Sequence, residues 1–181
     1  MDAMGEAVAT TTRRVVMKYK ARKFSQRSYN ENDDFAKNIV KKLLSTMDWV
    51  NEIDDKEDYG VDLTVIDNNG HHFFFEAEVK SGYAFTGVED FPFPSVSFLG
   101  RKKKWEDIGF YYCIVCRETE AICIAHSKDI YKEEYRELRN INKRDRQGLD
   151  AFYRVPKENC KWYKKEDYET GYELKNINEE E

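Results

Sequence analysis

The clearest pattern of hydrophobic and polar positions in this chain lies between residues 60 and 80. Two hydrophobic runs flank the sequence Asp-Asn-Asn-Gly at 67–70, which is typical of a three-residue hairpin loop closed by a left-handed glycine. In that register, Asp62 pairs with Glu76 across the two strands. A two-residue loop would turn Asp62 to the opposite face, so the predicted geometry depends on the type of turn.

The second strand of this predicted hairpin has two different faces. Glu76, Glu78 and Lys80 are spaced two residues apart, so they point to one side, while Ala77 and Val79 point to the other. Three consecutive phenylalanines near its start predict a largely buried strand. Burying several charges is costly without a metal ion or a charged partner, so this row is a candidate functional site.

Hydrophobic residues at helical spacing predict two helices. The first has Asn30 as its N-cap and ends near Met47. Its buried stripe is expected to contain Phe35, Ile39, Val40, Leu43, Leu44 and Met47. The second has Ser127 as its N-cap and runs towards Gly148. Its stripe is expected to contain Tyr131, Tyr135 and Leu138.

Further strands are predicted from short hydrophobic runs between turn residues. They span residues 15–19, 95–99, 110–116, 121–125 and 151–155. Both faces of the run 110–116 are hydrophobic, which is typical of a central strand. Pro156 ends the last run, which predicts a strand at the edge of the sheet.

Length and composition predict one domain of ordinary size. The chain has 181 residues, of which 40% are hydrophobic. We expect a domain at 25–164, a flexible basic N-terminal extension at 1–24, and an acidic C-terminal tail at 165–181 that frays. The sequence has neither a hydrophobic run long enough to span a bilayer nor a secretory signal. We therefore expect a cytoplasmic or nucleoid-associated protein that is not secreted and has no membrane partner. Four cysteines are expected to be reduced core residues: Cys113, Cys116, Cys123 and Cys160.

Charge is distributed unevenly along the chain, although the net charge is only −5. Basic residues gather at 13–27 and 143–146 and in a run of four, whereas the last sixteen residues are strongly acidic. Such clusters suit a groove that follows phosphates, although any single cluster can also be solvated surface. The run of four supplies the predicted nucleic-acid contacts: Arg101, Lys102, Lys103 and Lys104.

The charged row in the hairpin suits phosphodiester hydrolysis. This reaction develops negative charge on the phosphorus oxygens, and a Mg²⁺ ion held by oxygen ligands stabilises that charge and lowers the pKa of a bound water. Asp62 and Glu78 are the predicted ligands. Lys80 is placed to orient or deprotonate the attacking water, or to stabilise the transition state as a cation.

The spacing of these residues resembles the Asp…Glu-x-Lys signature of the PD-(D/E)XK nuclease superfamily, which includes restriction enzymes, Holliday-junction resolvases and phage endonucleases. The resemblance covers roughly residues 30–126, and Asp62, Glu78 and Lys80 match its motif positions. Val61 stands where the proline of the motif would be. The resemblance implies an α/β fold with a restriction-endonuclease-like core, in which helices flank a central mixed β-sheet.

The resemblance also implies an activity and its partners. It implies a Mg²⁺-dependent DNA endonuclease, with Mn²⁺ as a substitute, and a homodimer by analogy with resolvases. Relatives often add a glutamate from the first helix, for which Glu31 is the candidate; acidic residues are also favoured there by the helix dipole alone. Glu76 is either an additional carboxylate at the metal or a partner for a basic side chain.

Other interpretations of these residues compete with that of a nuclease. Charged residues make up 36% of the chain, so a Glu-x-Lys triplet alone can be a solvated strand face with a cross-strand ion pair. The chain would then be a non-catalytic nucleic-acid- or protein-binding module that keeps the nuclease fold. Cys113 and Cys116 have the spacing of a zinc knuckle but lie in a predicted strand, and the sequence has no Walker-type phosphate loop.

Overall fold

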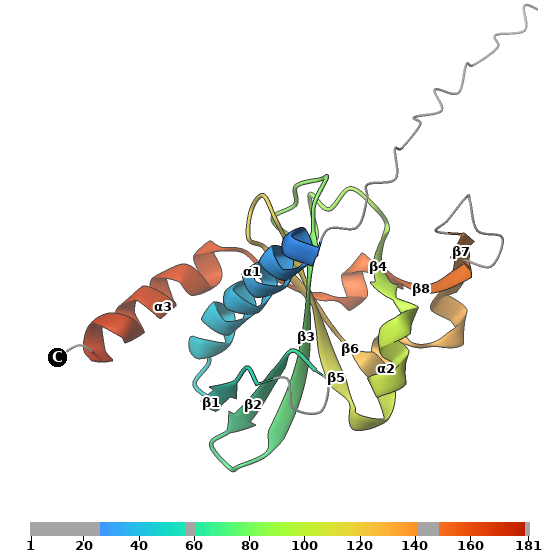
Figure 1. The fold of residues 1–181 in the computed structure, drawn as a ribbon. Coiled ribbons are helices and arrows are strands. Elements are labelled where there is room, and N and C mark those ends of the chain that lie inside the picture. Colours follow the sequence, from blue (N-terminus) through green and yellow to red (C-terminus); the bar gives the residue numbers. More distant parts are fainter. Residues whose placement is uncertain (1–25, 57–60, 141–148, 180–181) are drawn as a thin grey trace, which may run out of the picture.

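A six-stranded mixed sheet forms the middle layer of the computed structural model, which describes residues 26–56, 61–140 and 149–179 (Figure 1). Its strands lie in the order β1-β2-β3-β5-β6-β9. β3 runs parallel to β5, and the other neighbouring pairs run antiparallel. The strands are β1 (Val50–Asp54), β2 (Leu63–Asp67), β3 (His72–Lys80), β5 (Phe110–Cys116), β6 (Ile122–His126) and β9 (Lys161–Tyr163).

Two further layers cover the faces of this sheet. Helices α1 (Gln26–Ser45) and α3 (Glu166–Glu179) lie on one side, with α3 packed on α1. A three-stranded antiparallel sheet covers the other side, with the order β4-β8-β7. Its strands are β4 (Ser95–Leu99), β7 (Arg136–Asn140) and β8 (Leu149–Pro156). The short elements are α2 (Ser127–Ile130) and the 3₁₀ helices η2 (Gly100–Ile108), η3 (Glu133–Tyr135) and η4 (Lys157–Asn159).

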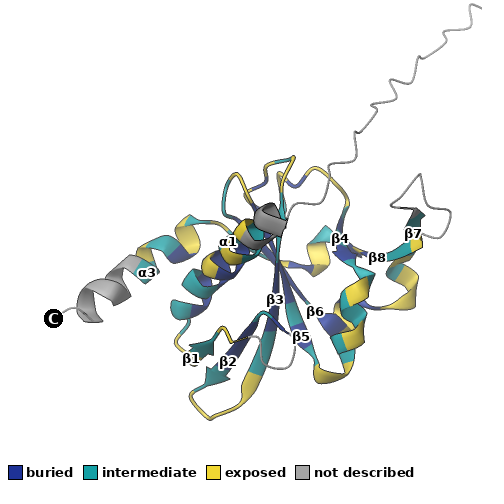
Figure 2. Cartoon of the chain, viewed as in Figure 1, coloured by how far each residue is buried: buried dark blue, intermediate teal, exposed yellow. Residues whose placement is uncertain are grey.

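The hydrophobic core has two halves, one on each side of the central sheet. Cys113 and Val115 of β5 pack towards α1, whereas Tyr112, Ile114 and Cys116 pack towards the small sheet. All five side chains are buried (Figure 2). The prediction that 110–116 is a central strand with two hydrophobic faces is therefore confirmed. The mixed α/β class, with a mixed central sheet and flanking helices, is also confirmed.

The hairpin of β2 and β3 has the register that its turn predicts. Asp67 donates its N–H to the carbonyl of His71 at 3.0 Å, and Gly70 donates to the carbonyl of Asp67 at 3.0 Å. Gly70 has φ +82°, the left-handed conformation that glycine adopts without strain. Leu63 lies opposite Phe75, so the chain continues with Asp62 at the level of Glu76.

The first predicted helix is confirmed, with a corrected start. Its N-cap was predicted at Asn30, but Asn30 lies inside α1, which begins at Gln26. Gln26 and Arg27 are good helix formers, and residues 26–30 contain no glycine or proline that would interrupt the helix. The expected stripe faces the sheet, with Ile39, Val40 and Leu43 buried. The predicted strand at 15–19 and the extension at 1–24 lie outside the described residues. Among the described helices, none has both the length and the hydrophobicity that a membrane crossing requires.

The second predicted helix is wrong. The α-helix that starts at Ser127 ends at Ile130, the 3₁₀ helix η3 follows at Glu133–Tyr135, and residues 136–140 form β7, which pairs with β8. His126, rather than Ser127, is the N-cap of α2 and accepts the N–H of Lys128 through its ring. The spacing that suggested a helix is misleading because Leu138 is more than half exposed on an edge strand, so no continuous buried stripe exists. Pairing with β8 has overridden the local pattern.

The segment predicted at the sheet edge is also placed differently. Residues 151–155 belong to β8, which is the central strand of the small sheet, and Pro156 ends its pairing with β4 opposite Ser95. The predicted strands at 95–99 and 110–116 have the predicted bounds. β1 and β9 were not predicted, because β1 is largely polar and β9 has three residues.

The chain after Lys164 was predicted to fray, and this is wrong for the described part. Residues Glu166–Glu179 form α3, and Tyr168 is fully buried against the α1 side of the core. The Tyr168 hydroxyl donates to the carbonyl of Glu120 at 2.8 Å. One buried aromatic anchor therefore holds an otherwise polar helix, which a compositional argument overlooks.

Tyr168→Ala is expected to lower the free energy of unfolding by roughly 3–5 kcal/mol, because it removes a buried ring and its hydrogen bond. Urea denaturation followed by circular dichroism measures the change. Thr170→Ala, at an exposed position of the same helix, is the control and should change stability by less than about 0.5 kcal/mol. Equal stability of the two variants would mean that α3 does not belong to the folded unit.

Candidate functional site

The charged row of β3 lies where the hairpin opens. β2 pairs with β3 only from His72 to Phe75, whereas the residues from Glu76 to Lys80 pair with β5 on their other side. Asp62, just before β2, lies at this open edge. Its Oδ2 accepts the N–H of Ala77 at 2.8 Å, which fixes the carboxylate against β3.

Glu76 is the most unusual residue of the site because its side chain has no exposed surface. Lys102 of η2 forms an ion pair with Oε2, but Oε1 is buried and has no hydrogen-bond partner. Burial and, next, the negative charge of Asp62 raise the pKa of Glu76 to about 8. Two adjacent carboxyl groups therefore share a region in which one oxygen lacks a donor or a cation.

Glu78 and Lys80 form a second, partly exposed pair on the same row. The Lys80 ammonium lies 3.1 Å from Glu78 Oε1, and the Tyr112 hydroxyl of β5 donates to Oε2. Burial and the charge of Glu78 raise the pKa of Tyr112, so its hydroxyl keeps its proton and remains a donor. These two contacts fix the orientation of the Glu78 carboxylate.

The first helix adds an ion-pair network at the other side of Asp62. The Lys37 ammonium lies 2.9 Å from Asp33 Oδ2 and 3.8 Å from Asp62 Oδ1. Because Lys37 is buried next to Asp62, its ammonium is poorly screened by water and partly balances the charge of Asp62. Glu31, the predicted helix residue, is exposed and does not line the cavity beside the row, whereas Asp33 does.

A cavity of about 230 Å³ reaches this row at Glu78. It lies between the start of α1, the end of β3 and the start of η2. Its polar lining consists of Asn32, Asp33, Glu78, Arg101, Lys102 and Tyr112. Asp62 and Glu76 lie behind this lining and are connected to it through Lys37 and Lys102.

The basic run of η2 has divided roles. Gly100 allows η2 to approach β8, because a Cβ at this position would lie 2.5 Å from the carbonyl oxygen of Ala151. Lys102 turns inward to Glu76, although it was predicted to contact phosphates. Lys103 lies over the ring of Tyr153 at 5.5 Å, and Lys104 lies over the neighbouring Trp105 at 4.7 Å. Arg101 is exposed at the cavity, so it is the best placed of the four for a phosphate.

The described acids of this site do not form a closed protein cage for a metal ion. Among the described residues, no group of three His, Cys, Asp or Glu side chains is arranged around one point. Mg²⁺ is usually held by one or two carboxylates together with water and phosphate oxygens. The orphaned Oε1 of Glu76 lies beside Asp62, whereas Lys80 and Tyr112 occupy both oxygens of Glu78. Asp62 and Glu76, rather than the predicted pair Asp62 and Glu78, would therefore hold a Mg²⁺ ion.

Other predicted ligand types have structural explanations. All four cysteines are free and buried, as predicted. Cys113 and Cys116 lie on opposite faces of the central sheet, which rules out a zinc knuckle between them. His126 caps α2, as expected of a structural histidine.

The sequence pattern predicts Asp62, Glu76, Glu78 and Lys80 as one group, but it does not predict the residues that contact them. Tyr112 was placed on a face of its strand, yet its contact with Glu78 depends on the pairing of β3 with β5. Lys37 has the i, i+4 spacing to Asp33 that indicates an ion pair, and this signal was available from the sequence.

Comparisons with models of protein families, with curated proteins and with solved structures found no match. The functional interpretation therefore depends on the residues and the geometry of this site.

The stability of Glu76→Gln relative to the parent is expected to increase as the pH rises from about 4.5 to about 8. Over this range the folded parent binds a proton at Glu76 that the unfolded chain does not, so the parent loses stability with rising pH. Glutamine does not titrate. The difference in the free energy of unfolding should grow by at most about 1.4 kcal/mol per pH unit.

Urea titrations in EDTA at about pH 5.5 and about pH 8 measure this difference. Loss of the Lys102 partner adds a cost at both pH values, so the change with pH is the informative quantity. Glu158→Gln, at an exposed position, is the control. If the parent and Glu76→Gln profiles run parallel, the carboxyl of Glu76 does not have a raised pKa.

Proposed function

We propose that this chain is a Mg²⁺-dependent nuclease that hydrolyses DNA phosphodiester bonds at the site formed by Asp62, Glu76, Glu78 and Lys80. One observation carries the proposal. A fully buried carboxylate oxygen, Glu76 Oε1, lies without a donor next to a second carboxylate at an open strand edge. Such an arrangement is costly to keep unless a cation or a proton is shared there.

The resemblance to PD-(D/E)XK nucleases gains support from this arrangement. Asp62, Glu78 and Lys80 occupy the motif positions, and all three lie at the end of a hairpin on one mixed sheet flanked by helices. A restriction-endonuclease-like core is accordingly part of the proposal. Cleavage of DNA by a homodimer, as in resolvases, stays a prediction from the resemblance.

The chemistry divides between the ion and the side chains. Mg²⁺, when bound, would stabilise the charge that develops on the phosphorus oxygens and lower the pKa of a water. Asp62 and Glu76 would hold it. Lys80, whose ammonium lies 3.1 Å from Glu78 Oε1, would supply the positive charge for the attacking water or for the scissile phosphate.

Two further contacts restrict the motion of these groups. Tyr112 holds the second oxygen of Glu78, so Lys80 is paired with a carboxylate that cannot rotate freely. Lys102 holds the Glu76 carboxyl group in place through its contact with Oε2. A rigid surrounding shell reduces the reorganisation that the reaction requires.

Lys80→Ala is expected to reduce Mg²⁺-dependent DNA cleavage by at least about a hundredfold while DNA binding is kept, because the lysine acts mainly in the transition state. Supercoiled, linear, branched and single-stranded DNA, each with Mg²⁺ or EDTA, identify the substrate of the parent chain. Lys164→Ala, which replaces an exposed lysine away from the site, is the matched control.

Two outcomes would count against the enzyme. Undiminished cleavage by pure Lys80→Ala would remove this lysine from the mechanism. DNA binding by the parent without cleavage of any substrate, in Mg²⁺ or in Mn²⁺, would favour the alternative of a non-catalytic binding module.

Mg²⁺ is also expected to raise the melting temperature of the parent chain, independently of any substrate. A ligand at a hundred times its dissociation constant stabilises the folded state by about 2.7 kcal/mol. Asp62→Asn and Glu76→Gln should each abolish this shift, whereas the exposed control Glu158→Gln should keep it. A shift of equal size in all four proteins would place the Mg²⁺ effect elsewhere.

A further inference from the structure

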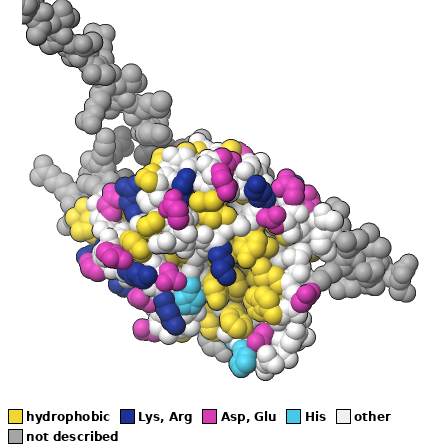
Figure 3. All heavy atoms as spheres, turned by 180° about the vertical axis from the view of Figure 1, so that it is seen from behind, with side chains coloured by type: hydrophobic (Ala, Val, Ile, Leu, Met, Phe, Trp, Pro, Cys, Tyr) yellow, Lys and Arg dark blue, Asp and Glu magenta, His cyan; other side chains and the backbone are white. Residues whose placement is uncertain are grey.

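A second cavity lies on the α1 side of the central sheet, opposite the face that carries the charged row. It has a volume of about 480 Å³, which is within the usual range for small-molecule sites. Hydrophobic side chains gather in one area of the molecular surface seen in Figure 3. We name this cavity the aromatic cavity, after Trp49, Phe73, Phe75, Tyr111 and Tyr163 in its lining.

Its floor is an aromatic row that crosses three strands. Phe75 lies opposite Tyr111 in the pairing of β3 with β5, and Tyr111 lies opposite His126 in the pairing of β5 with β6. The rings of Phe75 and Tyr111 are stacked at 5.0 Å, and the His126 ring meets Tyr111 edge-on at 4.9 Å. The rings of Phe75 and Tyr111 face each other, so the row forms a continuous aromatic floor against which a planar ligand can pack.

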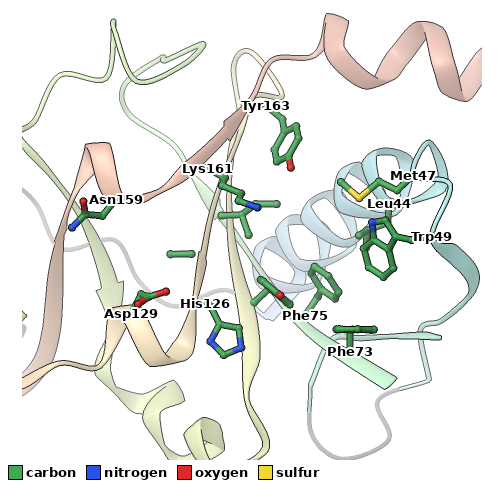
Figure 4. Close-up of a pocket in the computed structure, with 13 residues that line it drawn as sticks. Leu44, Met47, Trp49, Phe73, Phe75, His126, Asp129, Asn159, Lys161 and Tyr163 are labelled. Atoms are coloured by element: carbon green, nitrogen blue, oxygen red, sulfur yellow. The ribbon is translucent and has the colours of Figure 1, made fainter. Parts of the chain in front are cut away.

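One wall of the aromatic cavity has an exposed tryptophan. Trp49 is 38% exposed and contacts Phe73 edge-on at 5.3 Å. Figure 4 shows Trp49 and Phe73 on one side of the cavity and His126 and Lys161 on the other. Large aromatic side chains exposed in a hollow are typical of binding sites.

The polar groups are few and lie around the aromatic surface. Lys161 is opposite Ile124 in the pairing of β6 with β9, so it points to the same face as the cavity. Among the residues that the structure describes, no acid forms an ion pair with Lys161. Asp129 also lines the cavity but forms an ion pair with Lys132 at 3.3 Å, so Lys161 is the charge of the lining that a ligand can neutralise.

Groups at the rim provide both donors and acceptors. His126 Nδ1 accepts the N–H of Lys128 at 3.2 Å, so the neutral ring has its proton on Nε2. The amide nitrogen of Asn159 donates to the Tyr135 hydroxyl, which leaves its carbonyl oxygen as an acceptor at the cavity. A purely aliphatic ligand would leave these polar groups without partners.

We propose that the aromatic cavity binds a nucleotide, with the base on the aromatic row and the phosphate at the Lys161 ammonium. A nucleobase has a flat ring surface together with donors and acceptors at its edge. The phosphate supplies a negatively charged partner for the Lys161 ammonium. Stacking on aromatic side chains and pairing with lysine are the interactions that bind unpaired nucleotides. The nucleotide is either free or an unpaired unit of a strand. The proposal is independent of the nuclease site, because the two cavities share no lining residue.

Isothermal titration calorimetry with dAMP in EDTA tests this site without any contribution from a metal ion at Asp62 and Glu76. Lys161→Met should weaken dAMP binding about tenfold, which corresponds to about 1.4 kcal/mol. The same substitution should leave adenosine binding unchanged, because adenosine has no phosphate. Trp49→Ala should weaken both ligands, and Lys164→Met, an exposed lysine outside the cavity, should weaken neither.

The source of the nucleotide follows from a second titration with a 5′-phosphorylated single-stranded oligodeoxyadenylate. If the oligodeoxyadenylate binds and dAMP displaces it, the occupant is a strand end. If dAMP binds but the oligodeoxyadenylate does not, the occupant is a free nucleotide. The proposal is overturned if dAMP does not bind saturably, or if Lys161→Met and the parent bind it equally. It is also overturned if 8-anilinonaphthalene-1-sulfonate occupies the cavity and dAMP fails to displace it.

Discussion

The parallel pairing of β3 with β5 is the interaction on which the rest of the structure depends. Parallel strands are stable only where both faces of the sheet are covered. α1 and α3 cover one face and the small sheet covers the other, and each half of the core includes residues from both strands. The same pairing places Tyr112 beside Glu76 and brings its hydroxyl to Glu78, so core packing and the charged site share one register.

This register creates a conflict at the centre of the molecule. Glu76 occupies a fully buried position that a hydrophobic residue could fill, and only one of its two oxygens has a partner. A buried pair of charges is weak support for stability, which is consistent with the proposal that this carboxyl group binds a ligand. Lys37, Lys80 and Lys102 approach the acids from three different elements, which makes the site tolerable in the folded state.

β3 also connects the two cavities, because its side chains alternate between the faces. Phe73 and Phe75 line the aromatic cavity, and the next residues on the opposite face are the acids of the charged row. The two sites therefore share a rigid strand but no side chains. A substitution in one can be designed without a direct contact in the other.

Local patterns by themselves determined the hairpin, its turn and its register, since Asp67 to Gly70 specify a loop whose geometry fixes which residues face each other. They also determined the stripe of α1 and the alternation that places Glu76, Glu78 and Lys80 on one face. Tertiary structure alone decided the rest. Lys102 reaches Glu76 across 26 residues and Tyr112 reaches Glu78 across 34, so no local pattern specifies these contacts. The same holds for β7, whose pairing with β8 replaced an expected helix, and for Tyr168, whose burial converted an expected tail into α3. Short-range periodicity reports which face of a strand or helix a residue occupies, whereas burial and partners depend on segments that only the folded chain brings together.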